Sequence, residues 1–239
     1  MTHDELLSKL FPASHNVIVQ DGLVFGGGTL GGSQPVHVIG VAERSFLGVE
    51  GAIALAKHVL SAVKGTARHP ILVLVDSRSQ HMSRHDELMG LNEFLAHLAK
   101  CLLLAAAQGH RTVALLYGGS AAGAFIATAL ACDTLLALPG ANPEVMDLPS
   151  IARVTKLPLE KLQEMAAATP VFAPGLENFA QTGAVAQTLD PAGDLAAQVL
   201  EALSRPPASD ERDRLGAERG GRPRAAEIAT KVCREAKTA

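Results

Sequence analysis

The pattern of apolar and polar positions predicts strands and helices that alternate along most of the chain. Helical periodicity predicts a short helix within residues 1–15 and further helices at 49–64, 83–108, 121–131, 159–168 and 194–203. Apolar runs predict strands at 17–19, 23–25, 36–41, 71–75, 112–116 and 134–138, with a glycine-rich turn at 26–32. The repeated strand–helix–strand order predicts a largely parallel sheet with right-handed crossovers.

The C-terminal segment differs in composition from the rest of the chain. Residues 205–239 hold nine Lys or Arg and six Asp or Glu, although the whole chain has a net charge of -3. Pro, Gly and charged residues up to 224 favour a flexible linker, and residues 225–236 favour a helix that docks on a partner. We therefore expect one domain over 1–204 and a charged linker with a C-terminal helix over 205–239.

Composition and charge exclude several functional classes. Hydrophobic residues make up 48% of the chain but aromatic residues only 3%, so the core must consist of small aliphatic side chains. The weakly negative net charge does not favour nucleic acid or an anionic membrane surface. The apolar stretch 113–131 contains Gly118, Gly119 and Ser120, which favours a buried strand, turn and helix over a membrane span.

Cysteine usage and the N-terminus indicate a cytoplasmic protein. The three cysteines, Cys101, Cys132 and Cys233, lie far apart and in no CxxC or Cys/His ligand spacing. This is typical of a reduced protein. The first eleven residues, MTHDELLSKLF, have neither the basic start nor the apolar stretch of a signal peptide.

The segment LLYGGSAAGAF, residues 115–125, is the main candidate for chemistry. An apolar strand ends, a turn of Gly118, Gly119 and Ser120 follows, and a helix of small residues begins. N–H groups at a helix start lack an intrahelical acceptor, and the helix dipole adds positive charge there. Gly123 would let a substrate oxygen approach the backbone closely, so the turn suits an oxyanion. The alternative is that the glycines only permit a tight turn and close packing.

Two other uses of this turn fail on the sequence. A dinucleotide or P-loop site would need GxGxxG or GK[ST], and neither is present. A Clp-type protease would place its His after the nucleophile Ser120, yet all nine histidines lie at or before His110.

Residues 73–147 resemble the gamma subunit of malonate decarboxylase and, more distantly, the C-terminal domain of acyl-CoA carboxyltransferases. The resemblance extends over residues 36–203, and its distinctive motifs are DSRSQHMSRHDELMGLN and PEVMDLPSIARVTKLPLEKLQEMA. It implies an α/β fold of the crotonase-like (ClpP/crotonase) type, a spiral of ββα units like the carboxyltransferase C-terminal domain.

The resemblance also implies site residues. The carboxyltransferase Gly-Gly-Ala-aromatic motif aligns without a gap with Ala122 to Phe125, so the N–H of Gly123 or Ala124 would form an oxyanion hole. The expected catalytic residues are Gly119, Ser120, Gly123 and Ala124, and the expected substrate-binding residues here are Gly118, Ala122 and Phe125.

The activity implied by the resemblance is decarboxylation of malonyl-S-acyl carrier protein to the acetyl thioester and CO2. The site would be shared with a homologous beta subunit in a heterodimer. An acyl carrier protein subunit with a CoA-derived phosphopantetheine-type group would carry the substrate, and an acyl-carrier-protein transferase subunit is also implied. The chain itself would bind no cofactor. By analogy with carboxyltransferases, the Gly123 hole would face the departing carboxylate, and the alternative is that it faces the enolate oxygen.

The sequence departs from carboxyltransferases after the strand at 71–75. Carboxyltransferases have a Pro-Gly-Phe turn there, whereas Asp76 is followed by SRSQ in this chain. Ser77, Ser79 and Gln80 are candidates for contacts to the substrate carboxylate or to CO2, because ligands bind at the carboxyl ends of parallel strands.

An alternative interpretation makes this segment a solvated loop. Ser83 would cap the next helix, with Asp86 at the capping-box position. Arg84 is a further candidate for an anionic contact. His81 and His85 have a metal-ligand spacing, but the HxxxH motif lacks an acidic residue and Arg84 would repel a cation, so we expect no metal site.

Two rival functions remain open. A stand-alone crotonase-type acyl-CoA hydratase or isomerase would need a catalytic carboxylate, and Glu144 in ANPEV falls where some hydratases carry one. A surface turn is the alternative for Glu144. The second rival is a non-catalytic scaffold subunit that stabilises its partner.

Overall fold

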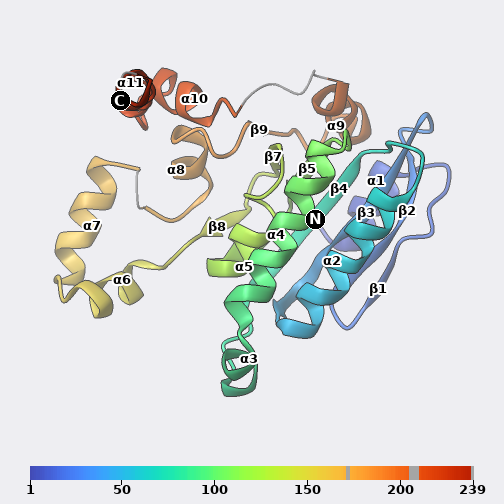
Figure 1. The fold of residues 1–239 in the computed structure, drawn as a ribbon, viewed down its shortest axis with the longest axis horizontal. Coiled ribbons are helices and arrows are strands. Elements are labelled where there is room, and N and C mark those ends of the chain that lie inside the picture. Colours follow the sequence, from blue (N-terminus) through green and yellow to red (C-terminus); the bar gives the residue numbers. More distant parts are fainter. Residues whose placement is uncertain (171–172, 205–209, 238–239) are drawn as a thin grey trace.

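A seven-stranded sheet in the order β1-β2-β3-β4-β5-β7-β9 forms the centre of the computed structural model, which describes residues 1–170, 173–204 and 210–237 (Figure 1). The strands of this sheet are β1 Ile18–Gln20, β2 Leu23–Leu30, β3 Gln34–Leu47, β4 Ile71–Gln80, β5 Thr112–Leu116, β7 Thr134–Ala137 and β9 Gln187–Thr188. The first three strands are antiparallel, and every pairing from β3 onward is parallel. The predicted parallel sheet is confirmed.

Helices cover both faces of the sheet. The helices are α1 His3–Leu10, α2 Val49–Lys64, α3 Arg84–Met89, α4 Leu91–Ala107, α5 Ala122–Ala127, α6 Leu148–Thr155, α7 Leu159–Ala168, α8 Leu176–Gln181, α9 Leu195–Ser204, α10 Arg212–Glu218 and α11 Ala225–Ala236. Helices α2, α4 and α5 pack on one face, and α1 and α9 pack on the other. In Figure 1, α6 and α7 extend away from the sheet beyond the short strand β8, Asn142–Glu144.

Strand β4 shows how the sequence produces this layered core. Its residues alternate between the two clusters: Ile71, Val73 and Val75 face the α2 and α4 side, whereas Leu72 and Leu74 face the α1 and α9 side. A strand buried on both faces needs apolar residues at every position, which explains the unbroken run ILVLV.

The predicted helix at 83–108 is wrong, because it is two helices. Gly90 has φ +85°, a left-handed conformation that ends α3 and begins α4. Glycine adopts this conformation without the Cβ clash that other residues meet. The predicted cap is confirmed, because the Asp86 N–H donates to Ser83 Oγ at 3.0 Å.

The predicted glycine-rich turn at 26–32 is also wrong for its first half. Gly26 to Gly28 lie inside β2, and only Gly31 and Gly32 belong to the turn before β3. A Cβ on Gly26 would lie 2.6 Å from the carbonyl oxygen of Asn16, so glycine is needed where Asn16 and Val17 pass close to β2. The glycines therefore serve close packing.

The C-terminal segment contains more structure than expected. Part of the predicted linker folds as α10, where the Arg219 guanidinium donates to the carbonyl oxygens of Ala180, Val185 and Ala186. The part of that linker at 205–209 lies outside the described residues. Helix α11 occupies 225–236 as predicted, and the division of the chain after residue 204 stays a proposal. Within the described part of the chain, every helix is too short or too polar to traverse a bilayer.

Candidate functional site

The turn between β5 and α5 contains a short strand that the sequence did not reveal. After Gly118, residues Gly119–Ala121 form β6, which pairs in parallel with β8, Asn142–Glu144. Ala122 then has φ +52°, and the chain enters α5. A non-glycine residue in this region carries strain of about 1–3 kcal/mol, which the surrounding structure must offset. Such residues are concentrated at functional sites.

Three side chains of β4 hold this turn in register. Asp76 Oδ1 accepts from the Gly119 N–H at 3.0 Å, the hydroxyls of Ser77 and Ser120 lie 2.7 Å apart, and Gln80 Oε1 accepts from the Gly123 N–H at 2.5 Å; each pair is 43 residues apart in sequence. Because the separation is constant, the end of β4 runs parallel to the turn. Side chains of β4 make the hydrogen bonds that link the two segments.

The expectation of a solvated loop after Val75 is wrong. Strand β4 continues to Gln80, and it pairs with β3 at Ser45–Ser77 and Leu47–Gln80 across two register shifts. Ser77 and Gln80, two of the polar residues that suggested a loop, bond to the turn. Tertiary hydrogen bonds thus override the low apolar content of this segment.

Ser77 and Ser120 differ from the role expected of them. Each is only 1% exposed, and their hydroxyls bond to each other. Neither hydroxyl is presented to a ligand, so both position the turn. Ser79, which is half-buried, donates its hydroxyl to the carbonyl oxygen of its neighbour Gln80 at 2.8 Å.

Gly123 lies at the edge of a groove, but its N–H is not free. The groove has a volume of about 270 Å³ and lies between α3, α4 and α5. Its lining residues include Gln80, Glu87, Leu91, Asn92, Leu95 and Gly123. The expectation that an N–H at this helix start lacks a partner is wrong for Gly123, because Gln80 Oε1 accepts its hydrogen bond.

The remaining residues of the motif divide between rim and core. Ala122 is partly exposed beside Gly123, whereas Ala124 and Phe125 are fully buried. The Phe125 ring packs edge-on against Phe179 with 5.2 Å between ring centroids. Phe125 therefore anchors α5 to the core and does not contact the groove.

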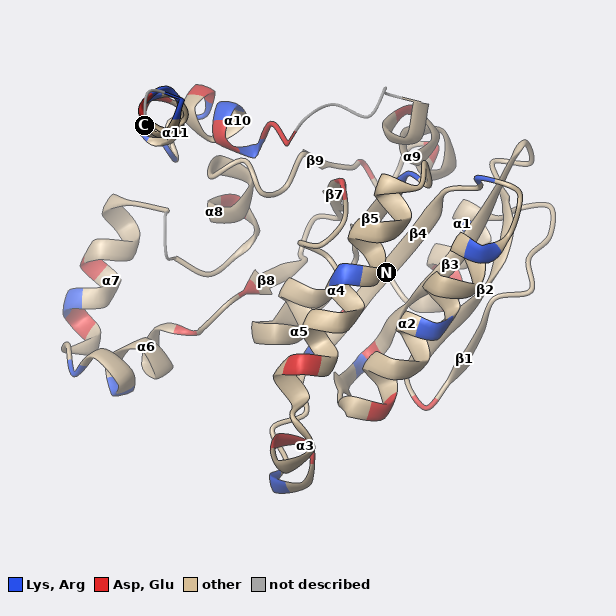
Figure 2. Ribbon diagram, viewed as in Figure 1, with Lys and Arg blue, Asp and Glu red and all other residues tan. Residues whose placement is uncertain are grey.

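Large apolar side chains are exposed on elements around the groove. Helix α5 carries no charged residue (Figure 2), and its Ile126 is 47% exposed. Helix α3 adds the exposed Leu88 and Met89, whereas the exposed Val145 and Met146 after β8 line a separate cavity. Exposed apolar surface of this kind marks an interaction site.

Glu144 lies beside the site in a strand, so its prediction as a surface turn is wrong. It pairs with Ala121 at the end of the small sheet. Partial burial, with Asp147 nearby, raises the pKa of the Glu144 carboxyl, and Arg44 opposes this shift. Arg84 is exposed at the first position of α3.

Of the two histidines after β4, His81 is held by a structural contact and His85 is exposed. His81 Nδ1 lies 2.5 Å from Asp86 Oδ2, and the Val49 N–H donates to the other oxygen of that carboxylate at 3.0 Å. Over the described residues there is no group of three or more His, Cys, Asp or Glu side chains arranged to hold a metal ion.

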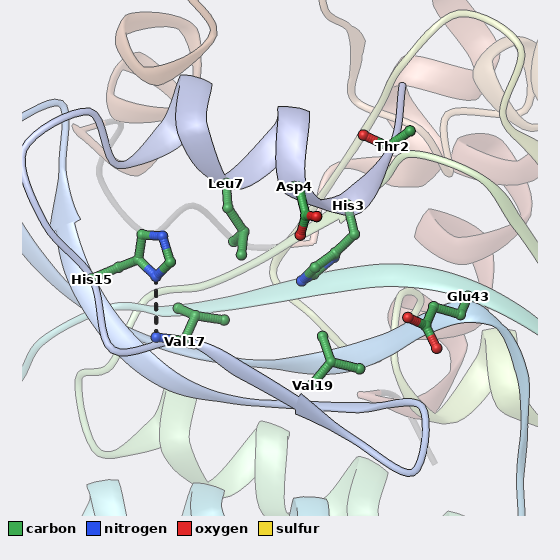
Figure 3. A pocket seen from close by; sticks show the side chains of 8 residues that line it. All are labelled: Thr2, His3, Asp4, Leu7, His15, Val17, Val19 and Glu43. Carbon is green, nitrogen blue, oxygen red and sulfur yellow. Dashed lines mark hydrogen bonds between the residues drawn. The ribbon is translucent and has the colours of Figure 1, made fainter.

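A second cavity of about 460 Å³ lies on the opposite face of the sheet, between α1 and the first strands (Figure 3). His3 and Glu43 point into it, and His3 Nδ1 lies 3.0 Å from the hydroxyl of Tyr117. Burial raises the pKa of Tyr117, with Asp76 and Glu43 adding to the effect. The sequence carried no signal for this cavity, because its lining comes from segments far apart in the chain.

Known proteins resemble this chain over most of its length. Residues 42–236 match the family of malonate decarboxylase gamma subunits. The chain is 29% identical over 202 residues to the malonyl-S-ACP:biotin-protein carboxyltransferase MADD of Malonomonas rubra, with 76% of this chain and 69% of the relative covered.

Two solved structures show the same similarity. The Pseudomonas malonate decarboxylase hetero-tetramer in complex with coenzyme A aligns with a TM-score of 0.81 at 24% identity, over 97% of this chain and 98% of the matched chain. The Pseudomonas MdcD-MdcE hetero-dimer aligns with a TM-score of 0.75 at 25% identity, over 97% of each chain.

The fold and the family expected from the sequence are both confirmed. The architecture is the crotonase-like α/β fold of carboxyltransferases. The family match covers most of the chain and includes β4, the turn and α5. The chain therefore belongs to the malonate decarboxylase gamma subunit family and is a subunit of a decarboxylase.

Proposed function

We propose that this chain and a homologous beta subunit form a shared site that decarboxylates a malonyl thioester carried on an acyl carrier protein. The Pseudomonas structure of an MdcD-MdcE hetero-dimer and the malonyl-S-ACP substrate of the Malonomonas rubra relative support the proposal. The exposed apolar residues around the groove supply a surface for the partner. A phosphopantetheine-type arm on the carrier protein would present the substrate, and a transferase subunit would load the carrier.

The reaction needs stabilisation of negative charge. When the bond between the α-carbon and the carboxylate breaks, CO2 leaves and the electron pair forms an enolate whose charge falls largely on the thioester oxygen. A proton then adds to the α-carbon and gives the acetyl thioester. A backbone N–H that is already oriented suits this step, because it lowers the energy of the charge as the charge forms.

The observation that carries the proposal is the Gly123 N–H at the edge of the groove. It already holds a carbonyl oxygen, that of the Gln80 side chain, at 2.5 Å. The strained backbone of Ala122 sets the direction of the following peptide. Differential binding favours the thioester oxygen as the ligand, because charge grows there while it disperses from the departing carboxylate.

Gly123→Val in the reconstituted complex tests the proposal. A Cβ at this position would lie 2.9 Å from both Gln80 Oε1 and Leu95 Cδ1, so a valine side chain fills the approach to the amide. We expect kcat for CO2 release to fall by about 10²–10³-fold, the loss typical of one oxyanion donor. Gly193→Val is a matched control, since a Cβ there meets its neighbours at no less than 3.4 Å.

Two activity measurements, CO2 release by the complex and enoyl-CoA turnover by the chain alone, separate the rival functions. Undiminished CO2 release from an intact Gly123→Val complex would support a scaffold role and remove the site assignment. Turnover of an enoyl-CoA by the chain alone, abolished by Glu144→Gln, would support a hydratase or isomerase.

A further inference from the structure

We propose that Gln80 is a specificity-determining residue: its side-chain carbonyl occupies the Gly123 donor in the free subunit and is displaced by the enolate oxygen that forms during the reaction. This inference rests on the proposed function of Gly123. Gln80 would then compete with the ligand for the Gly123 N–H. This role differs from the contact to the substrate carboxylate that the sequence suggested for Gln80.

The backbone of Gln80 is held in place, so any rearrangement belongs to its side chain. Gln80 ends β4 and pairs with Leu47 of β3, and the His81 N–H donates to the Leu47 carbonyl oxygen at 2.9 Å. The carbonyl oxygen of Gln80 accepts from the Ser79 hydroxyl. The side chain itself is only partly buried and lies on the wall of the 270 Å³ groove.

The chemistry of the competing groups sets the selectivity. The Gly123 N–H has one hydrogen, which either Gln80 Oε1 or a ligand oxygen can accept. Exchange of one neutral carbonyl for another gains little, whereas a charged oxygen forms a hydrogen bond about twice as strong. A neutral acyl thioester such as the product therefore gains nothing by displacing Gln80, but the enolate does.

The groove can also receive the displaced amide. Asn92 and Glu87 line it together with Gln80: Asn92 has side-chain N–H donors for the freed Oε1, and Glu87 has acceptors for the Gln80 amide N–H groups. The side chain can thus rotate within the groove and keep polar partners.

Inhibition by acetyl-CoA, a neutral thioester, tests the competition in the reconstituted complex. In Gln80→Ala the competitor is absent, so acetyl-CoA should inhibit malonyl-CoA decarboxylation roughly 2- to 10-fold more strongly, the ratio expected for one hydrogen bond. Gln80→Glu should lower kcat/KM at least about 10-fold, because a carboxylate holds the N–H more tightly and repels an anionic oxygen. Gln108→Ala, which shortens an exposed side chain at the opposite end of α4, should change neither value.

The amide exchange rate of Gly123 in the free subunit gives a readout independent of activity. Gln80→Ala should accelerate hydrogen exchange of this N–H by NMR, and unchanged exchange overturns the proposal. Equal or weaker acetyl-CoA inhibition in Gln80→Ala also overturns it, even where exchange accelerates. Full activity of Gly123→Val overturns the proposed function instead, so the two failures are distinct.

Discussion

Asp76 Oδ1 accepts a hydrogen bond from the backbone N–H of Gly119 at 3.0 Å, and this contact ties the end of β4 to the turn before α5. Gly119 is buried, so its N–H would otherwise lie unpaired away from water. The position of the turn thus depends on a carboxylate that lies 43 residues before Gly119 in the chain.

Asp76→Ala should destabilise the chain by about 1–3 kcal/mol, the penalty for a buried donor left without its acceptor. Decarboxylation by the reconstituted complex should fall with it, because the turn loses its anchor. Asp76→Asn keeps an oxygen acceptor and should retain most of the stability. Urea unfolding and CO2 release measure the two effects, and equal losses in Ala and Asn variants would show that charge matters instead of the hydrogen bond.

Gly118→Ala should disturb the same contact by steric overlap. A Cβ at position 118 would lie 2.1 Å from Asp76 Oδ1, so the carboxylate must move. The cost of Gly118→Ala should therefore be smaller in an Asp76→Ala background than in the wild type. A double-mutant cycle from unfolding measurements checks this, and additive effects would contradict a steric overlap between the two side chains.

The paired hydroxyls of Ser77 and Ser120 should show a similar coupling. Either single change to Ala leaves one buried hydroxyl without its partner and should cost about 1–3 kcal/mol. The double Ala variant removes both polar groups and should cost less than the sum of the single changes. Thermal unfolding of the four proteins tests this, and a double variant as costly as the sum would show that the hydroxyls act independently.

Asp86 should make stability depend on pH in the acid range. The Ser83 hydroxyl, the Val49 N–H and His81 hold the pKa of its carboxyl at about 2, below its ordinary value of 3.8. Since the folded value is depressed, the contribution of Asp86 is full above about 3.8 and is lost as pH falls toward 2. The stability difference between wild type and Asp86→Asn should therefore shrink between pH 4 and 2. A difference constant across this window would contradict it.

Arg219 should hold α10 against the body of the protein. Its guanidinium donates to the carbonyl oxygens of Ala180, Val185 and Ala186 at 2.6, 2.7 and 2.8 Å. Arg219→Ala should expose residues 210–224 to limited proteolysis at a rate several-fold above wild type. The exposed Arg224→Ala serves as a control that removes the same charge. Equal rates in both variants would show that packing of α10 suffices without the guanidinium.

Much of the layered core follows from the sequence alone. Helices α2, α7 and α11 and strand β5 have the bounds that the pattern predicts, because local periodicity and end signals suffice where a segment is uniformly helical or uniformly apolar. The pattern predicts strand β4 as far as Val75 for the same reason. The sequence also predicts the candidate site, because Gly118, Gly119 and Gly123 lie where a predicted strand gives way to a predicted helix.

Only the tertiary structure decided what that site contains. The segment Asp76–Gln80 is polar and lacks strand periodicity, so nothing local shows that it continues β4 and bonds to the turn. The pairing of Gln80 with the Gly123 N–H and the burial of Ser77 against Ser120 join residues 43 apart. The local pattern of residues reflects how a segment interacts with its sequence neighbours and with water. These contacts, in contrast, exist only once β4, β5 and α5 have packed together.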